Sequence, residues 1–393
     1  MPDERDRSCV KPPFSLILLP TLRCNADCEY CFETRTEDRL TLNQLAVVLR
    51  KVLDYMQDRQ IDTLSIYWQG GEVMTQPPEW FERAHELVQE IATAREKRIG
   101  NYLQTNMIGY GPKWKPVITE MFGNSLGTSM DFPNLHRRVK GGTPQQYQDL
   151  WERKVLEARE AGIEIGVIAI PNAGTVEAGA EAFYSYFVDR LGIRDFQVNT
   201  PFPGGMSKAV KCAHPLETED LSRFLLELAD IWEKRGRDAG VRIGPFDKLL
   251  AYFEQGTKDL LCIWRENCAN EFVCIDPRGH VAQCDCWVSS YPEYRFGNIL
   301  DPVSLSDLLR RSDARREFQM RPGSLIQTEE CLDCDYLAIC HGGCPVRAYS
   351  VHGDILTKDP YCDLYKKIFA RMEAMSGGGC HTTAGISTEP TVP

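Results

Sequence analysis

The chain has 393 residues, a formal net charge of -11 at pH 7 and a hydrophobic content of 43%. This length and apolar content allow one large packed domain plus a smaller one, and the acidic balance argues against a protein that binds nucleic acid through a basic surface. No apolar run approaches the roughly 20 residues that span a bilayer, and the N-terminus lacks the apolar core of a signal peptide. We therefore expect a cytoplasmic protein with no membrane or nucleic-acid partner.

Strand-like and helix-like segments alternate through the first half of the chain. The expected strands are 14–19, 61–68, 100–104, 125–130, 163–170 and 195–199, and the expected helices between them are 40–59, 78–95, 114–121, 144–161 and 176–191. Alternation of this kind predicts an α/β fold in which parallel strands with outer helices form a partial (β/α)6, TIM-like barrel.

Polar residues follow most of these strands, where barrels of parallel strands gather their chemistry. They include Gln69 to Glu72, Gln104 to Asn106, Ser129 with Asp131, and Gln197 with Asn199. Ordinary turn chemistry explains any one of these positions, but together they predict a polar rim at one end of the barrel.

The remainder of the chain changes in composition after residue 200. Pro and Gly at 200–205 mark a boundary, helices are expected at 217–235 and 246–255, and a cysteine-rich segment follows. We expect an N-terminal extension (1–13), a barrel (14–200), bridging helices (201–260), a small cysteine-rich domain (261–376) and a disordered tail (377–393).

Sixteen cysteines are distributed unevenly along the chain. Three lie between residues 24 and 31, none lies between 32 and 211, and ten lie between 262 and 362. Because cytosolic thiols stay reduced, metal binding is favoured over a disulfide framework. Two separate metal-binding regions are therefore expected.

The first cysteine group consists of Cys24, Cys28 and Cys31, spaced C-x3-C-x2-C just after the first strand. Three thiolates can hold three irons of a four-iron cluster and leave the fourth iron open. A zinc site or free buried thiols are the alternatives, but a structural zinc site needs four ligands and no further Cys or His lies nearby in the sequence until His85.

Together with Gly70-Gly71-Glu72 at the end of the second strand, this motif resembles the radical S-adenosylmethionine (SAM) enzymes. The resemblance implies that SAM binds the open iron and is cleaved by one electron to a 5'-deoxyadenosyl radical. It implies SAM contacts from the strand ends, with Glu72 and the adjacent glycines at the methionine ammonium and Tyr30 against the adenine. The full set of implied SAM-binding residues is Tyr30, Gln69, Gly70, Gly71, Glu72, Gln104, Ser129 and Asp131.

The C-terminal cysteines resemble the SPASM domain, an extension of radical SAM enzymes that holds two auxiliary [4Fe-4S] clusters. The resemblance implies a second cysteine group, Cys262, Cys268, Cys284 and Cys344, and a third cysteine group, Cys331, Cys334, Cys340 and Cys362, each of which ligates one cluster fully. A zinc ribbon is the alternative for this half of the chain. The remaining cysteines are not expected to be ligands: Cys9, Cys212, Cys274, Cys286 and Cys380.

The order of these motifs resembles that of anaerobic sulfatase-maturating enzymes and related peptide-modifying maturases. That resemblance implies a peptide or protein substrate, a flavodoxin- or ferredoxin-type electron donor, and Asp285 as the catalytic base. The negative charge of a neighbouring cluster should raise the Asp285 pKa, which suits a proton acceptor. Val73-Met74-Thr75 departs from the Pro-Thr that usually follows Gly-Gly-Glu in maturases.

Several products are compatible with these motifs. Oxidation of a cysteine or serine to formylglycine and crosslinking of peptide side chains use nearly the same residues. Modification of a small molecule, and electron transfer without catalysis, are the alternatives from other classes.

Overall fold

We describe residues 12–202, 216–270 and 272–377 of a computed structural model of the chain. The predicted tail after residue 377, residues 1–11 of the predicted extension, residues 203–205 of the predicted boundary, and Cys9, Cys212 and Cys380 lie outside the described residues.

The described residues form ten strands and fourteen α-helices in one continuous fold. The strands are β1 (Phe14–Thr21), β2 (Thr63–Gly70), β3 (Arg98–Thr105), β4 (Ser125–Ser129), β5 (Glu164–Ala169), β6 (Asp195–Val198), β7 (Arg242–Gly244), β8 (Phe272–Ile275), β9 (His280–Ala282) and β10 (Gly297–Asn298). The first seven helices are α1 (Leu42–Asp58), α2 (Pro78–Thr93), α3 (Lys115–Phe122), α4 (Pro144–Glu160), α5 (Ala173–Tyr184), α6 (Thr218–Ile231) and α7 (Phe246–Gln255). The others are α8 (Asp285–Ser290), α9 (Leu305–Arg311), α10 (Asp313–Ile326), α11 (Glu329–Leu332), α12 (Leu337–Cys340), α13 (Pro345–His352) and α14 (Cys362–Met375). No helix in these described ranges is both long and apolar enough to cross a membrane.

All ten strands join one sheet in the order β10-β9-β8-β1-β2-β3-β4-β5-β6-β7. Strands β1 to β7 pair in parallel, which confirms the predicted α/β class and the alternation of strands and helices. The three-residue strand β7 lies between two helices that the sequence pattern predicts and was not itself expected. Strand β8 pairs in parallel with β1, so the sheet continues from the barrel into the cysteine-rich region.

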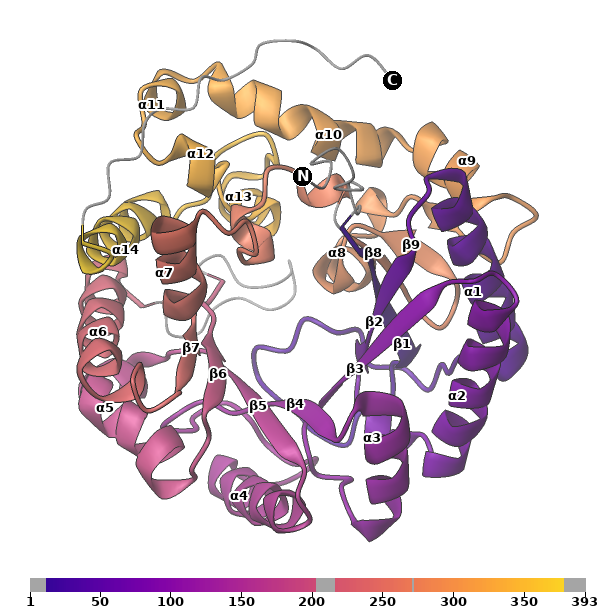
Figure 1. Ribbon diagram of the computed structural model, residues 1–393, viewed down its shortest axis with the longest axis horizontal. Coiled ribbons are helices and arrows are strands. Elements are labelled where there is room, and N and C mark those ends of the chain that lie inside the picture. Colours follow the sequence, from indigo (N-terminus) through magenta and orange to yellow (C-terminus); the bar gives the residue numbers. More distant parts are fainter. Residues whose placement is uncertain (1–11, 203–215, 271, 378–393) are drawn as a thin grey trace, which may run out of the picture.

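The helices cover the outer face of the sheet because alternate strand residues on that face are apolar. Leu16 on β1 and Ile66 and Trp68 on β2 are fully buried there, and the Trp68 indole donates a hydrogen bond of 2.9 Å to Oδ1 of Asn101. In Figure 1 helices α1 to α6 lie outside the arc of strands. The segment that carries α10 to α14 lies on the side where this arc is open.

Local signals in the sequence explain where several helices begin. Thr41 and Thr143 cap α1 and α4, and Gln44 and Gln146 complete a capping box in each case. The predicted helix 176–191 begins earlier, because Asn172 caps α5, and its last part is the π-helical segment Ser185–Arg190.

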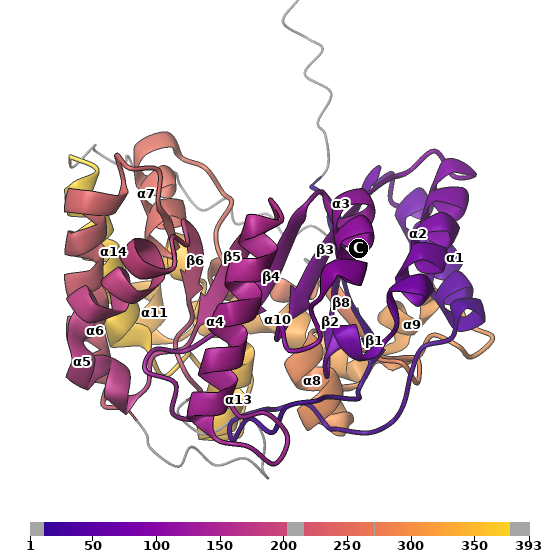
Figure 2. The same cartoon turned by 90° about the horizontal axis from the view of Figure 1, so that it is seen from below.

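Loops at one end of the strands bring the two cysteine-rich parts of the chain together. The loop after β1, which carries the first cysteine group, runs along the same end of the molecule as α8 and α13 (Figure 2). The hydroxyl of Ser290 in α8 donates a hydrogen bond of 3.2 Å to the carbonyl of Phe32 in that loop. The sheet and these contacts therefore place both parts around a common space.

Candidate functional site

A cavity of about 480 Å3 lies between the strand ends and the cysteine-rich region, and we call it the chamber. Its polar and cysteine lining comes from both parts of the chain and includes the residues of the expected polar rim except Asp131 and Gln197. From the first half of the chain it includes Cys24, Cys28, Tyr30, Cys31, Glu33, Gln69, Gly70, Gly71, Glu72, Gln104, Ser129, Arg137 and Asn199. From the second half it includes Cys262, Cys268, Gln283, Cys284, Asp285, Cys286, Cys344 and Arg347.

All three residues of the first cysteine group line the chamber. The backbone N–H of Ala26 donates a hydrogen bond of 3.4 Å to Sγ of Cys24. Burial is the main cause that raises the pKa of Cys24 to about 12, and the charges of Glu72, Cys31 and Cys28 add to it. The Cys24 thiol is therefore a poor anion by itself, and a bound metal cation is the kind of partner that reverses this effect.

The second cysteine group also comes together, from four separate elements. Burial raises the pKa of Cys268, and the neighbouring charges of Cys284, Cys344 and Cys262 raise it further. Cys284 and Cys344 immediately precede helices α8 and α13. The structure thus gathers the four cysteines that the resemblance assigns to one cluster.

The third cysteine group lies outside the chamber lining, with Cys331 on α11, Cys340 on α12, Cys362 at the start of α14 and Cys334 in the connection between α11 and α12. Burial raises the pKa of Cys340 to about 12, and the charges of Cys362 and Cys334 add to this effect. Cys331 and Cys362 are both electrostatic neighbours of the Lys358 ammonium. No disulfide joins any cysteines of the described ranges, so all of these thiols are available as ligands there.

Glycines 70 and 71 bring the end of β2 against the cysteine loop. A Cβ atom at Gly71 would lie 2.5 Å from the carbonyl oxygen of Arg23, and Gly70 has a φ of +132°, which side chains rarely adopt. Glycine is therefore needed at position 71 because the backbone around Arg23 packs directly against it. A cofactor bound in the chamber could approach this turn as well.

The Glu72 carboxylate is 3% exposed and already accepts three hydrogen bonds from the protein. The donors are the backbone N–H groups of Met74 at 2.9 Å and Asn106 at 2.6 Å, and the Thr105 hydroxyl at 2.5 Å. Burial raises its pKa, and these donors oppose the shift. Glu72 therefore fixes the strand ends of β2 and β3 at the chamber wall.

Tyr30 and Asp131, both expected at a cofactor, are joined to each other. The Tyr30 hydroxyl donates a hydrogen bond of 2.5 Å to Oδ2 of Asp131, and Nε of Arg137 donates to the same oxygen at 3.1 Å. Asp131 is 1% exposed and is not part of the chamber lining, whereas Tyr30 and Arg137 are. Asp131 thus lies behind the chamber wall and orients the two residues that face it.

Gln104 and Ser129 face the chamber as a pair, since the Gln104 amide donates a hydrogen bond of 2.9 Å to the Ser129 hydroxyl. Gly127 makes room for this arrangement, because a Cβ atom there would lie 2.2 Å from Oε1 of Gln104. A polar edge of the sheet therefore lies open to the chamber.

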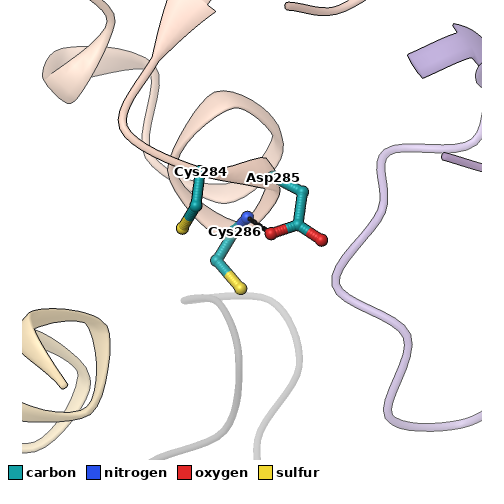
Figure 3. A group of neighbouring side chains, drawn as sticks. All are labelled: Cys284, Asp285 and Cys286. Carbon is teal, nitrogen blue, oxygen red and sulfur yellow. Dashed lines mark hydrogen bonds between the residues drawn. The ribbon is translucent and has the colours of Figure 1, made fainter. Parts of the chain in front are cut away.

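Asp285 lies at the first turn of α8, and one oxygen of its carboxylate lies within 4.8 Å of the sulfurs of Cys284 and Cys286 (Figure 3). Its Oδ1 accepts a hydrogen bond of 3.0 Å from the Cys286 N–H, and its Oδ2 accepts one of 2.8 Å from the Gln69 amide. Burial raises the Asp285 pKa. Gln69, expected at the cofactor, is therefore engaged with Asp285 across the chamber.

Glu33 is a chamber residue that the sequence patterns did not single out. Its carboxylate accepts a hydrogen bond of 2.6 Å from the Ser289 hydroxyl of α8. Burial, followed by the charge of Asp285, raises its pKa to about 8. Its place two residues after Cys31 was the available signal, but no spacing rule assigns a role to that position.

The two extra cysteines of this region differ in where they lie. Cys274 on β8 is fully buried and away from the chamber lining, as expected for a small apolar side chain. Cys286 is also buried, but it lines the chamber, and its sulfur lies on the same side of α8 as that of Cys284 (Figure 3).

The chamber also contains polar atoms that lack a protein partner. Nε of Arg347 and Nε1 of Trp264 are buried donors without a hydrogen-bond acceptor, and they lie three and two residues from Cys344 and Cys262. Buried donors normally find an acceptor. Cluster sulfurs or a polar cofactor in the chamber would supply one, so this wall fits an iron-sulfur cluster and SAM.

Curated relatives of this chain are enzymes that act on sulfatases or peptides, although no family model matches it. It is 27% identical to a cysteine-type anaerobic sulfatase-maturating enzyme of Clostridium perfringens, over 91% of this chain and 96% of that protein. It is 25% identical to a serine-type enzyme of Bacteroides thetaiotaomicron, over 88% and 85%. A PqqA peptide cyclase of Granulibacter bethesdensis is 24% identical, over 95% and 93%.

Solved structures with the same fold contain SAM and peptides. The structure of native anSMEcpe with bound AdoMet (another abbreviation of SAM) matches with a TM-score of 0.78 and 25% identity, over 93% of this chain and 99% of that chain. The same protein with bound AdoMet and the Kp18Cys peptide matches with a TM-score of 0.77, the same identity and the same coverage of both chains.

Proposed function

Because this chain is a homologue of sulfatase-maturating enzymes and PqqA peptide cyclases, which are radical SAM enzymes, we propose that it removes a hydrogen atom from a side chain of a peptide or protein. One observation carries the proposal: the first cysteine group, the Gly70–Glu72 turn and Asp285 all face one chamber. An open iron, a SAM site and a proton acceptor are the parts that such a reaction needs.

When bound, SAM and the first cluster supply a 5'-deoxyadenosyl radical after one-electron reduction. Cys24, Cys28 and Cys31 hold this cluster in the proposal. SAM is held by the chamber-facing residues Tyr30, Gly70, Gly71, Glu72, Gln104 and Ser129. Asp131 supports Tyr30 from behind, and Gln69 reaches from the SAM side of the chamber to Asp285.

Asp285 is the proposed base. Its carboxylate is half-buried, is oriented by the Gln69 amide and lies beside Cys284, a proposed ligand of the first auxiliary cluster. Oxidation of a serine or cysteine side chain removes a hydrogen atom from Cβ, a proton from the hydroxyl or thiol, and one electron. Asp285 would accept the proton, and the electron would pass to an auxiliary cluster. With cysteine, water would hydrolyse the resulting thioaldehyde to the aldehyde and release hydrogen sulfide. The second and third cysteine groups hold the two auxiliary clusters.

Formylglycine formation on a cysteine or serine is the leading product, because the curated relatives described above include both cysteine-type and serine-type sulfatase-maturating enzymes. Crosslinking within a peptide is the second candidate, and it rests on the similarity to the PqqA peptide cyclase. A low-potential flavodoxin or ferredoxin is the proposed electron donor. A cytoplasmic location suits thiolate ligands that must stay reduced.

The test uses anaerobically reconstituted protein with about twelve irons per chain, four for each of three clusters. It is given SAM, dithionite and three peptides that differ only in a central cysteine, serine or alanine. We expect 5'-deoxyadenosine with every peptide and an aldehyde product only with cysteine or serine. If peptide fragments of the product remain covalently joined in tandem mass spectrometry, the result supports crosslinking instead. Iron-loaded protein that forms no 5'-deoxyadenosine refutes the proposed function.

A further inference from the structure

Helix α10 carries a buried guanidinium that has no carboxylate partner. The Arg321 side chain is 6% exposed and donates hydrogen bonds to four backbone carbonyls. These belong to Ile355 at 2.7 Å, Thr357 at 2.8 Å, Gly342 at 2.9 Å and His341 at 3.4 Å. Within the described ranges no acidic side chain forms an ion pair with it. A buried cation in such surroundings is costly unless an anion lies close to it.

The charged neighbours of Arg321 are mostly cysteines, and they come from both auxiliary sets. Burial lowers its pKa, while the thiolates of Cys268 and Cys344, then Asp359 and Cys340, act to raise it. The carbonyls of His341 and Gly342 belong to the short connection between Cys340 and Cys344. Those two cysteines are assigned to different clusters, so Arg321 holds the segment that links them.

A second buried arginine near these cysteines, Arg347, is neutralised in the usual way, by an ion pair with a carboxylate. Arg347 is 4% exposed and forms an ion pair of 3.4 Å with Asp359. The Asp359 carboxylate also accepts a hydrogen bond of 2.8 Å from the backbone N–H of Cys344. Arg347 is therefore paired directly with a carboxylate, whereas Arg321 donates only to backbone carbonyls.

Four thiolates around a [4Fe-4S] core leave a net negative charge, and nearby charge is one of the factors that set the reduction potential of a cluster. We propose that Arg321 is the counter-charge shared by the two auxiliary clusters, and that it raises their reduction potentials while it holds the connection between Cys340 and Cys344. This inference rests on the proposed cofactors. Arg321 acts as a positioning residue and does not touch the substrate.

The same helix provides a matched control. Arg315 is also buried, at 9% exposure, and it donates a hydrogen bond of 3.4 Å to the carbonyl of Ala269, the residue after Cys268. Burial lowers its pKa too, but the charged groups that act on this pKa are Tyr55 and Arg59 and include no cysteine. Replacement of Arg315 therefore removes a buried guanidinium from α10 without removing charge from the clusters.

The experiment measures auxiliary-cluster potentials by a redox titration followed by electron paramagnetic resonance. The full chain is used, with Cys24, Cys28 and Cys31 replaced by alanine so that the first cluster does not contribute. In this background Arg321→Gln should disfavour reduction at least tenfold, which is about 59 mV for one electron. Arg321→Lys should keep most of the parent potential, and Arg315→Gln should keep all of it.

Two outcomes with iron-loaded variants overturn the proposal. An unchanged potential in iron-loaded Arg321→Gln removes the electrostatic role, and an equal shift in Arg315→Gln makes the effect one of general packing. If Arg321→Gln loses iron, Arg321→Lys decides: retained iron with the parent potential supports the proposal, and loss of iron there too makes Arg321 a purely structural residue. Failure of the unmodified protein to cleave SAM would refute the proposed function but leave these potentials interpretable.

Discussion

The side-chain amide of Gln69 donates a hydrogen bond of 2.8 Å to Oδ2 of Asp285, although the two residues lie 216 positions apart in the sequence. Gln69 is near the end of β2 in the barrel, and Asp285 opens α8 in the cysteine-rich region. The proposed base is therefore oriented by the same strand that ends in the proposed SAM-binding turn. The two parts of the chain form one site.

Replacement of Asp285 should separate SAM cleavage from substrate oxidation. We expect Asp285→Asn to keep its iron and to form 5'-deoxyadenosine, while the oxidised peptide falls by about 100-fold or more, as is typical for loss of a general base. The measurement is the ratio of oxidised peptide to 5'-deoxyadenosine by mass spectrometry. A ratio equal to that of the unmodified protein would assign the base elsewhere.

Gln69→Leu tests whether Gln69 serves Asp285 or SAM. Loss of a hydrogen bond to a charged group is worth roughly 1.5–3 kcal/mol, so oxidation should slow by about 10- to 100-fold. Equilibrium binding should show an unchanged Kd for SAM. If SAM binding weakens and oxidation per cleaved SAM stays normal, Gln69 is a cofactor contact instead.

Gly71→Ala should damage the first cluster site, because its Cβ would lie 2.5 Å from the Arg23 carbonyl in the cysteine loop. We expect loss of about four of about twelve irons per chain and of SAM cleavage. Gly111→Ala is the control, since nothing lies within 4 Å of a Cβ atom there. Equal iron contents in the two variants would show that the loop tolerates the displacement.

Glu72→Gln should weaken both the fold and SAM binding. The amide cannot accept all three of the hydrogen bonds that the Glu72 carboxylate now accepts, and a buried donor left unsatisfied costs about 1–3 kcal/mol. Thermal unfolding and SAM titration measure the two effects. The exposed Glu79→Gln should change neither, and a Glu72→Gln protein with unchanged SAM affinity would remove Glu72 from the SAM site.

Removal of iron should loosen the cysteine-rich region before the barrel. Helices α11 and α12 have four residues each, too few to be stable without the ligands that anchor them. After chelation under reducing conditions, limited proteolysis should cut between residues 329 and 340 while α1 stays intact. The same cleavage pattern with and without iron would contradict this order.

The fold was largely predictable because its signals are local. Helix α7 occupies Phe246–Gln255 as expected, and α2 and α4 begin at the predicted prolines. Strand β7 was missed because three residues carry no recognisable periodicity. The pairing of β8 with β1 is a contact between distant segments, which no local pattern encodes.

The site was predictable as a set of residues but not as a network. The distribution of the cysteines predicted two metal-binding regions, and the family resemblance divided the second region into two groups. In the structure the cysteine neighbours of Cys268 and of Cys340 belong to those same groups. Sequence order could not show that Asp131 lies behind Tyr30, because side-chain direction at a strand end depends on the turn that follows. Glu33 was missed for a related reason, since its contact with Ser289 forms only when α8 folds against the cysteine loop.

The most direct test of the account follows a hydrogen atom from substrate to cofactor. Iron-loaded protein, SAM and dithionite are given a peptide whose central cysteine or serine carries deuterium at Cβ. We expect deuterium in the 5'-deoxyadenosine and an oxidised or crosslinked peptide. Product formation with unlabelled 5'-deoxyadenosine only would contradict transfer of a hydrogen atom from the substrate to the cofactor.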